Sequence, residues 1–318
     1  MKLAFTFPGQ GSQSVGMGKE LAQGFASARA VFEEVDDALS QNLSGLMWDG
    51  PGEDLSLTTN TQPALMACSM AVMAVLKQDF DTDVDAASYV AGHSLGEYSA
   101  LCAAGSFTLS QTAILLRLRG EAMQKAVPVG PKGNMGAMAA LLGADLDVAA
   151  AAVIAGAKSG ICQIANDNAT GQVVISGDKL AVDAAIEMAN ELGVRKAVLL
   201  SVSAPFHCDL MAPAAEAMAD VLADADLKMP MVPVVNNVTA APVTDPAQLK
   251  TDLVAQVTGR VRWRESVTWM AEDGVEVFAE PGTGKVLTGM LRRIVKGVDG
   301  VVLSTPEALE AFAERLKG

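Results

Sequence analysis

One serine in this sequence is flanked by glycines in a pattern that could make it a nucleophile. The motif Gly-x-Ser-x-Gly spans residues 92–96 and has Ser94 at its centre. A short apolar run at 87–91 precedes the motif, and the helix-like run 95–103 follows it. In a strand-to-helix turn, flanking glycines avoid clashes, and the helix N-terminus points free N–H groups at the serine. The pattern predicts an enzyme that carries an acyl group on Ser94, although a plain helix N-cap serine is the alternative.

A serine hydroxyl becomes nucleophilic when a nearby base takes its proton, and histidine is the usual base. The sequence contains 2 histidines. His93 is adjacent to Ser94, so its side chain is expected to point away from the serine hydroxyl. His207 is therefore the candidate base, and a hydrogen-bonded structural histidine is the alternative. The sequence does not identify an Asp or Glu that would orient the imidazole, and a backbone carbonyl could serve equally well.

Three segments together resemble a known family. They are Phe7–Gln13 with the letters FPGQGSQ, Gly92–Glu97 with GHSLGE, and Pro205–His207 with PFH. In these segments the sequence is similar to the malonyl-CoA:acyl carrier protein transacylase family, the acyltransferases of bacterial fatty acid synthesis. The resemblance covers essentially the whole chain and includes the late segment Val261–Trp263.

The resemblance implies a ping-pong transfer, with malonyl-CoA and acyl carrier protein as partners. Ser94 would attack the malonyl thioester of coenzyme A, and the phosphopantetheine thiol of acyl carrier protein would then collect the malonyl group. His207 would act first as base and then as acid, with its imidazole held by the main-chain carbonyl of Gln256. Coenzyme A would enter as part of the substrate, so the family implies no separate cofactor and no metal.

The resemblance also implies that two backbone amides form an oxyanion hole. They belong to Leu95, directly after the serine, and to Gln10 in the loop 8–11. Glycines around Gln10 allow N–H groups to approach a tetrahedral oxygen, and losing one such donor typically slows a reaction by about 10²–10³-fold. A simple tight turn is the alternative for this loop. Leu95 and Phe206 also resemble the residues of malonyl-selective members of the family.

Arg119 matches the arginine with which the family binds the free carboxylate of malonyl. A guanidinium can form two parallel hydrogen bonds with a carboxylate, which a lysine cannot. A buried arginine would also disfavour acetyl groups, because its charge would then lack a partner. Helix spacing alone would favour Arg117 equally, and a surface ion pair with Glu97 or Glu121 is the alternative for Arg119.

The rest of the sequence predicts the elements that must position these residues. Pro63 is expected to open a helix, and the change of pattern near Pro128 and Pro131 is expected to begin a second unit. Strands of the first unit are expected at 3–7, 87–91, 232–236 and 276–279, and its helices at 19–39, 64–76, 95–103, 111–125, 213–223 and 246–257. In the second unit the order β-α-β-β-α-β is expected at 135–142, 145–155, 161–165, 172–176, 178–192 and 196–202.

These elements predict an α/β fold in two parts. The first is a large α/β-hydrolase-like domain with a parallel sheet core, formed by residues 1–129 and 204–318. The second is an inserted small ferredoxin-like domain, residues 130–203, because the order β-α-β-β-α-β is typical of that fold. Of the 318 residues, 50% are hydrophobic but 4% are aromatic, a composition that suits packed α/β layers built from aliphatic side chains.

The charge of the chain limits its partners. With 23 basic and 37 acidic residues the net charge is −14, which argues against general binding of nucleic acid. An acidic carrier protein would have to dock on a local basic patch. Arg195 with Lys196 is one candidate, and Arg292, Arg293 and Lys296 form the other, although solvated helix faces are the alternative for both.

The sequence also carries expectations about location. No apolar run approaches the roughly 20 residues of a membrane span, and the first run, 3–7, is too short for a signal peptide. The 4 cysteines are widely spaced, which argues against a disulfide framework or a structural zinc. We therefore expect a cytoplasmic enzyme that does not bind membranes and that works as a free-standing monomer.

Two other functions share some of these features. A serine hydrolase or thioesterase would use the same serine motif and a later histidine, but would pass the acyl group to water. A non-catalytic docking module could keep the acyltransferase framework without its reaction. The presence of Ser94, His207 and Arg119 together argues against such a module.

Overall fold

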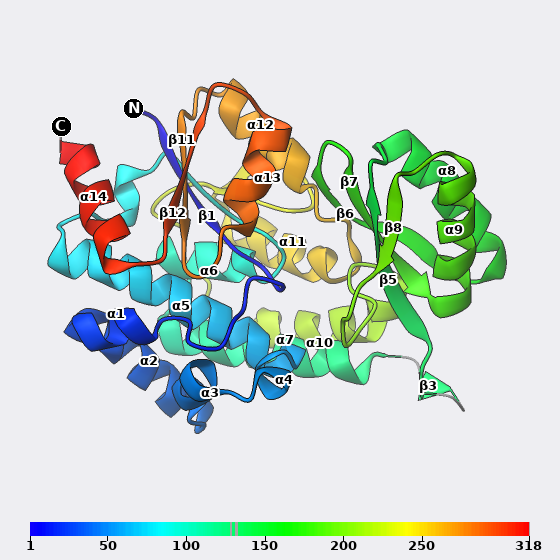
Figure 1. Ribbon diagram of the computed structural model, residues 1–318. Helices are drawn as coiled ribbons and strands as arrows, with labels where there is room; N and C mark the ends of the chain where they lie inside the picture. Colours follow the sequence, from blue (N-terminus) through cyan, green and yellow to red (C-terminus); the bar gives the residue numbers. More distant parts are fainter. Residues whose placement is uncertain (128, 131–132, 318) are drawn as a thin grey trace.

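The central feature of the fold is a mixed sheet of 6 strands. The computed structural model describes residues 1–127, 129–130 and 133–317. The strands run in the order β10-β9-β2-β1-β11-β12, of which β1, β11 and β12 are labelled side by side in Figure 1. Neighbouring strands are parallel except at the edge, where β9 and β10 are antiparallel. The strands are Leu3–Phe7 (β1), Tyr89–Gly92 (β2), Val234–Val235 (β9), Pro242–Val243 (β10), Val277–Pro281 (β11) and Asp299–Leu303 (β12).

Helices cover both faces of this sheet, so its strands are buried on two sides. Along β1, Leu3 and Phe5 belong to one buried cluster, and Ala4 between them belongs to another. Burial on both faces is typical of parallel strands. The helices around the sheet are Lys19–Gly24 (α1), Ala26–Leu39 (α2), Leu43–Asp49 (α3), Gly52–Leu55 (α4), Thr58–Asp79 (α5), Gly96–Ala103 (α6), Leu109–Lys125 (α7), Ala212–Asp224 (α10), Pro246–Thr258 (α11), Trp263–Glu272 (α12), Val286–Ile294 (α13) and Pro306–Lys317 (α14). Within the described ranges, none of the helices has the length and apolar character needed to cross a membrane.

Two of the predicted helices differ in the structure. The run 19–39 is divided into α1 and α2, because Phe25 has extended backbone angles between them. The expectation that Pro63 opens a helix is wrong, since α5 begins at Thr58 and Pro63 lies inside it. A proline at this depth removes one helical hydrogen bond. Packing of the buried helix α5 against α2 and α7 outweighs that loss.

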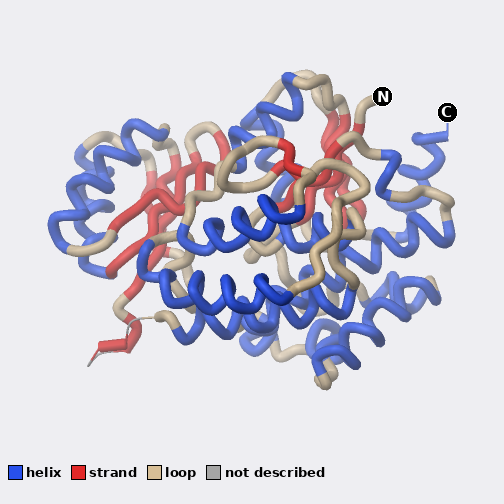
Figure 2. The backbone as a smooth tube through the Cα atoms, turned by 180° about the vertical axis from the view of Figure 1, so that it is seen from behind, coloured by secondary structure: helices blue, strands red, loops and turns tan. Residues whose placement is uncertain are grey.

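A second sheet of 4 strands, in the order β6-β7-β5-β8, is antiparallel throughout. Its elements follow one another as Gly136–Leu142 (β5), Leu146–Gly156 (α8), Cys162–Ala169 (β6), Gln172–Asp178 (β7), Lys179–Glu191 (α9) and Lys196–Leu199 (β8). The helices α8 and α9 pack on it around a separate, alanine-rich cluster. Figure 2 shows this sheet at the end of the molecule away from both termini.

Smaller elements complete the chain. A short ribbon of Val129–Gly130 (β3) and Gly133–Asn134 (β4) precedes the second sheet. The predicted change of pattern at Pro128 and Pro131 lies outside the described residues. Short 3₁₀ turns are Val84–Ala86, Ala157–Ser159 and Asp209–Met211.

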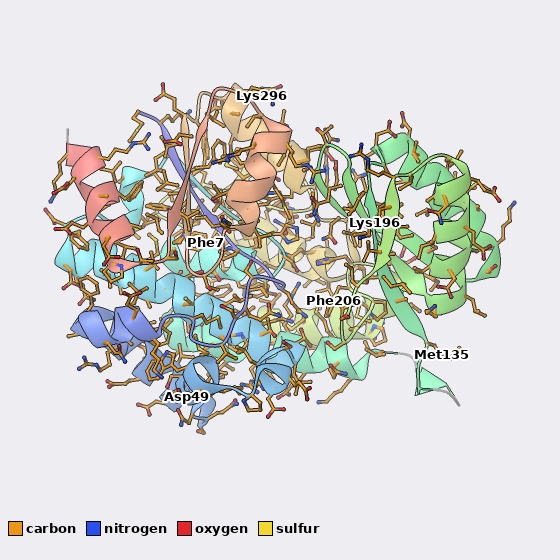
Figure 3. The ribbon with its side chains drawn as sticks, in the orientation of Figure 1. Phe7, Asp49, Met135, Lys196, Phe206 and Lys296 are labelled. Carbon is orange, nitrogen blue, oxygen red and sulfur yellow. The ribbon has the colours of Figure 1, made fainter. Side chains whose placement is uncertain are left out.

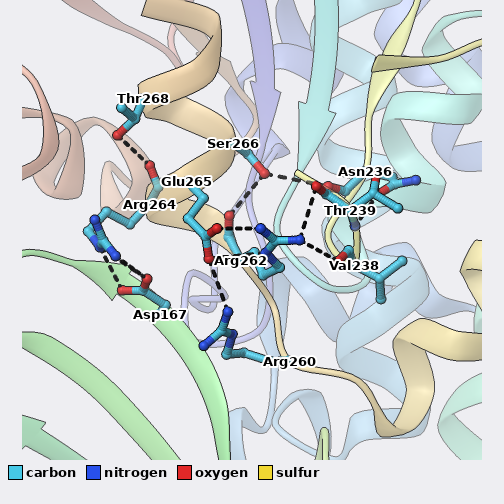
Figure 4. Close-up of polar contacts among 10 residues, drawn as sticks. All are labelled: Asp167, Asn236, Val238, Thr239, Arg260, Arg262, Arg264, Glu265, Ser266 and Thr268. Carbon is cyan, nitrogen blue, oxygen red and sulfur yellow. Dashed lines mark hydrogen bonds and ion pairs between the residues drawn. The ribbon is translucent and has the colours of Figure 1, made fainter. Parts of the chain in front are cut away.

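The two sheets are joined by backbone and side-chain contacts. In the segment that follows α11, Val261 forms a parallel bridge with Asn166 of β6. The amide of Asp167 donates to the carbonyl of Val261 at 2.9 Å. The buried carboxylate of Asp167 also accepts hydrogen bonds from Arg264 of α12 (Figure 4). These contacts fix β6 beside the parallel sheet, so the space between the sheets has defined walls.

Candidate active site

Ser94 occupies a sharp turn between β2 and α6. Its φ is 53°, in the left-handed region that a residue with a side chain rarely adopts. A Cβ atom on Gly92 would lie 1.9 Å from the carbonyl of Gly96, and one on Gly96 would lie 2.2 Å from the carbonyl oxygen of Phe7. Both positions therefore require glycine, as the motif predicted. The turn projects Ser94 from the carboxyl end of β2.

His207 meets Ser94 across the site. The Nε2 atom of His207 lies 2.8 Å from Ser94 Oγ. His207 is buried, and its φ of 59° is also left-handed. Burial, reinforced by the positive charge of Arg119, lowers the pKa of His207 to about 3. The imidazole is therefore neutral at neutral pH and can accept the serine proton.

Two backbone carbonyls orient the imidazole. His207 Nδ1 lies 2.9 Å from the carbonyl oxygen of Gln256 and 3.1 Å from that of Gly259. Because carbonyl oxygens only accept, Nδ1 carries the hydrogen and Nε2 keeps its lone pair for Ser94. Gln256 lies in the last turn of α11, where carbonyls have no partner within the helix. The family resemblance had pointed to the Gln256 carbonyl, whereas the contact with Gly259 was not anticipated.

Arg119 lies beneath Ser94 rather than on the surface. Its side chain is 1% exposed. Nη1 donates to Gln62 Oε1 at 2.8 Å, and Nη2 donates to Gln256 Oε1 at 2.8 Å and to Ser94 Oγ at 3.2 Å. All of these acceptors are neutral, and burial lowers the pKa of Arg119. The surface ion pair considered from the sequence is absent among these contacts.

Arg117 faces a different part of the molecule. Its guanidinium donates to Asn60 Oδ1 at 3.1 Å and to the side chain of Gln41. Sequence spacing could not separate Arg117 from Arg119, but the structure places Arg119 alone of the two against Ser94.

The loop that contains Gln10 packs against the serine turn. A Cβ atom on Gly9 would lie 2.6 Å from the carbonyl oxygen of His93, so glycine permits this approach. Within the described chain, the backbone amides of Gln10 and Leu95 donate to no other group. Neither predicted amide therefore has a partner among the described residues. The side chain of Gln10 is turned to Thr58, whose hydroxyl donates to Gln10 Oε1 at 3.1 Å.

A pocket of about 370 Å³ opens over Ser94. Its lining includes Gln10 and His207 from loops and, from the antiparallel sheet, Met138 of β5 and Val174 of β7. Phe206, which also lines the pocket, lies between the two parts of the molecule in Figure 3. The pocket therefore lies at the junction that the Val261 bridge and the Asp167 contacts hold together.

His93 points away from the serine hydroxyl, as its position in the sequence predicted. Its Nε2 lies 2.8 Å from Asn168 Oδ1, and its ring packs edge-on against Trp263 at 5.8 Å between centroids. Burial lowers its pKa. His93 is therefore a wall residue, and His207 is the base candidate that the geometry supports.

Several polar residues beneath the turn were not predicted from the sequence. Glu97 Oε2 accepts hydrogen bonds from the Asn237 amide and from Gln256 Nε2, each at 2.9 Å. Gln256 Nε2 also donates to the carbonyl oxygen of Ser94 at 3.0 Å. Burial raises the pKa of Glu97 to about 7. Glu97 could have been noticed as a charged residue in a buried motif, but nothing in the sequence links it to Asn237.

The fold and the site together define an α/β enzyme in which a half-buried serine faces a buried histidine and a buried arginine lies beside the serine. Residues 4–305 match the family described as acyl transferase domain. This chain therefore belongs to the acyl transferase family.

Similar proteins cover the same length. The chain is 43% identical over 317 residues to the malonyl CoA-acyl carrier protein transacylase of Bacillus subtilis (strain 168). The aligned region covers 99% of this chain and 98% of that protein. It is 42% identical over 313 residues to the protein of the same name from Escherichia coli (strain K12), covering 98% and 99% of the two chains.

Solved structures agree with this relationship. An acyl-carrier-protein-S-malonyltransferase from Bartonella henselae superposes with a TM-score of 0.96 at 53% identity and covers 100% of both chains. A malonyl-transacylase solved in complex with its type II PKS acyl-carrier protein gives a TM-score of 0.94 at 39% identity, covering 99% of this chain and 100% of that one.

Proposed function

We propose that this enzyme transfers the malonyl group of malonyl-CoA to the phosphopantetheine thiol of acyl carrier protein, for fatty acid synthesis. One observation carries the choice of acyl group. Arg119 is buried, has only neutral acceptors, and places Nη2 at 3.2 Å from Ser94 Oγ. An acyl group that ends in a carboxylate would supply the opposite charge and accept two parallel hydrogen bonds. Acetyl would leave the arginine unpaired.

The proposed reaction proceeds through a malonyl-serine intermediate. Ser94 Oγ attacks the thioester carbonyl while His207 Nε2 takes the serine proton, and the tetrahedral oxyanion accepts hydrogen bonds from the amides of Gln10 and Leu95. The C–S bond breaks, and the protonated His207 returns the proton to the departing coenzyme A thiolate. The carrier thiol then gives its proton to His207 and attacks the acyl-serine. Ser94 leaves and is protonated by His207.

Gln256 and Gly259 support both halves of this cycle. Their carbonyl oxygens hold His207 Nδ1–H at 2.9 and 3.1 Å, so they stabilise the imidazolium without themselves being protonated. Coenzyme A enters as a thioester substrate, and the proposed steps use no cofactor or metal.

We further propose the domain boundaries and finer fold assignment made from the sequence. Residues 130–203 would be an inserted ferredoxin-like domain, and 1–129 with 204–318 an α/β-hydrolase-like domain. The element order β5-α8-β6-β7-α9-β8 and its separate core support the first assignment. The strand-turn-helix around Ser94 supports the second. A monomer would suffice, because every proposed site residue comes from one chain.

Acyl carrier protein is proposed to dock on an exposed basic patch near the pocket. Arg195 and Lys196 are exposed at the start of β8, whereas Arg292 and Lys296 are exposed at the end of α13. Arg293 of the second patch is partly engaged, because it donates to Gln172 Oε1 at 3.0 Å.

Carrier-dependent malonyl transfer tests the proposal. The enzyme is incubated with malonyl-CoA, with and without purified holo acyl carrier protein, and malonyl-carrier and free malonate are measured. Carrier-dependent product is expected. Malonate released equally fast without the carrier would establish a hydrolase instead.

Mass spectrometry after brief exposure to malonyl-CoA distinguishes the enzyme from a non-catalytic docking module. Wild type should gain one malonyl group that is lost in Ser94→Ala. A wild-type protein without an adduct would support a non-catalytic docking module.

A further inference from the structure

The side chain of Asn237 spans the turn that carries Ser94. Ser94 N–H donates to Asn237 Oδ1 at 2.7 Å, and Asn237 Nδ2 donates to the carbonyl oxygen of Gly92 at 2.6 Å. Asn237 is completely buried. One amide group thus bonds the backbone on both sides of His93, although Asn237 is 143 residues from Ser94.

The register of the sheet explains how this side chain reaches the turn. Strands β2 and β9 are parallel, with Ala91 opposite Val235. Two residues further along, the same register places Asn237 opposite His93. In a regular parallel ladder, residue 237 would bond Gly92 and Ser94 through its own main-chain N–H and C=O groups.

The main-chain groups of Asn237 are used elsewhere. Its N–H donates to Glu97 Oε2 at 2.9 Å, and its carbonyl oxygen accepts from the amide of Arg262 at 2.9 Å. The side-chain amide, which has both a donor and an acceptor, therefore takes the place of the missing main-chain pair. The ladder is continued for one more residue, just where Ser94 turns into its left-handed conformation.

The loop that presents Asn237 is held from behind. Arg262 Nη1 donates to the carbonyl oxygens of Val238 and Thr239, both at 3.1 Å, and Glu265 binds the same guanidinium (Figure 4). Ser266 Oγ contacts the carbonyl oxygen of Asn236 at 3.4 Å. These contacts with the start of α12 fix the loop without touching Ser94.

We propose that Asn237 is a positioning residue, which holds the backbone of Ser94 in the conformation that aims its hydroxyl at His207. The proposal rests on the proposed role of Ser94 as nucleophile. Only an amide fits this place. Asn237→Asp keeps the shape but brings a carboxylate oxygen against the Gly92 carbonyl, and Asn237→Ala leaves the Ser94 N–H without its acceptor.

The test measures the reactivity of Ser94 separately from malonyl transfer. A fluorophosphonate reagent labels nucleophilic serines, and its pseudo-first-order labelling rate does not depend on how much of the sample is folded. We expect Asn237→Asp and Asn237→Ala to slow labelling and kcat by about 100-fold, the cost of a misplacement near 1 Å. The KM for malonyl-CoA should be unchanged, because Asn237 does not line the pocket.

Asn60→Ala is the matched control. Asn60 is also buried, but its side chain bonds Gln41, Arg117 and the carbonyl oxygen of Asp54 and contacts neither the serine turn nor the loop of Asn237. Labelling by Asn60→Ala should stay close to wild type. An Asn237 variant that labels as fast as this control would overturn the proposal, as would failure of both Asn237 variants to fold while Asn60→Ala folds.

The wild type distinguishes this proposal from the proposed function. A wild-type protein that is not labelled at Ser94 would refute the nucleophile and with it both proposals. A wild type that is labelled but does not transfer malonyl would refute malonyl transfer alone, and a slow Asn237→Asp would still support positioning.

Discussion

Replacing Arg119 with alanine would test how the site selects its acyl group. Arg119 is 1% exposed, and its Nη2 lies 3.2 Å from Ser94 Oγ. A carboxylate on an acyl group attached to Ser94 would therefore meet a desolvated positive charge. Hydrogen bonds to charged groups contribute about 1.5–3 kcal/mol each, and a guanidinium offers two of them to a carboxylate. Losing both predicts a fall of roughly 10²–10⁴-fold in kcat/KM for malonyl-CoA.

The selectivity ratio isolates this effect from general damage. Arg119→Ala also leaves Gln62 Oε1 and Gln256 Oε1 without their donor, which costs free energy whichever thioester is bound. That cost is common to malonyl-CoA and acetyl-CoA, so it cancels in the ratio of their kcat/KM values. The malonyl-to-acetyl ratio should therefore fall by roughly 10²–10⁴-fold.

The assay compares the two thioesters with the same preparation of enzyme and carrier protein. Arg117→Ala is the matched control, because Arg117 lies on the same helix but bonds Asn60 and Gln41. Its malonyl-to-acetyl ratio should equal that of wild type. Equal losses for both thioesters in Arg119→Ala would refute the assignment of Arg119 to the carboxylate.

The other predictions concern the turn and the buried titratable groups. Gly96→Ala should abolish acylation, measured by mass spectrometry, because its Cβ would lie 2.2 Å from the Phe7 carbonyl oxygen; an acylated variant would show that the turn can relax. Since the pKa of His207 is lowered to about 3, the unfolded state binds more protons than the folded state below about pH 6.5. The free energy of unfolding should therefore decrease by up to about 1.4 kcal/mol for each pH unit as the pH is lowered from about 6.5 towards 3. Urea unfolding from pH 6.5 towards 3 should show a smaller slope in His207→Gln, and identical slopes would contradict a buried neutral imidazole. The pKa of Glu97 is raised to about 7, so the folded state keeps this proton up to a higher pH than the unfolded state does. The stability that this group contributes is therefore lost as pH rises from about 4.5 to 7. Glu97→Gln should remove that loss when urea unfolding is measured from about pH 4.5 to 7, and an unchanged profile would contradict it.

Local sterics made part of the fold predictable. The glycines of the serine motif are required by contacts within the turn and with its neighbouring strand, so the strand-turn-helix was predicted correctly. Thr108 caps α7 with a capping box that involves Gln111, and this too follows from nearby residues. Pro63 misled the prediction, because burial of α5 between other helices decides that helix and no local rule reports it.

Less of the candidate site could be predicted from local sequence patterns. Ser94 and His207 followed from residue chemistry, whereas Gln10, Arg119 and Gln256 came from the family resemblance. Spacing along one helix could not choose between two arginines, since the choice depends on which face of α7 packs against the serine turn. The side chain of Gln256 also forms hydrogen bonds with Arg119, Glu97 and Ser94. No sequence pattern indicated these contacts.

Ser94 and His207 are held in place by residues far away in the sequence, which explains why local patterns predict so little of the site. Ser94 and His207 both have left-handed backbones, and such strain costs of order 1–3 kcal/mol each unless the surroundings enforce it. For Ser94 the enforcing groups are Asn237 and Gln256, which are 143 and 162 residues away. Residues this distant meet only after the parallel sheet has set the register of β2 against β9. The nucleophile is thus specified by a short motif but held in place by the completed fold, so its reactivity should be lost before the secondary structure when the loop after β9 is loosened.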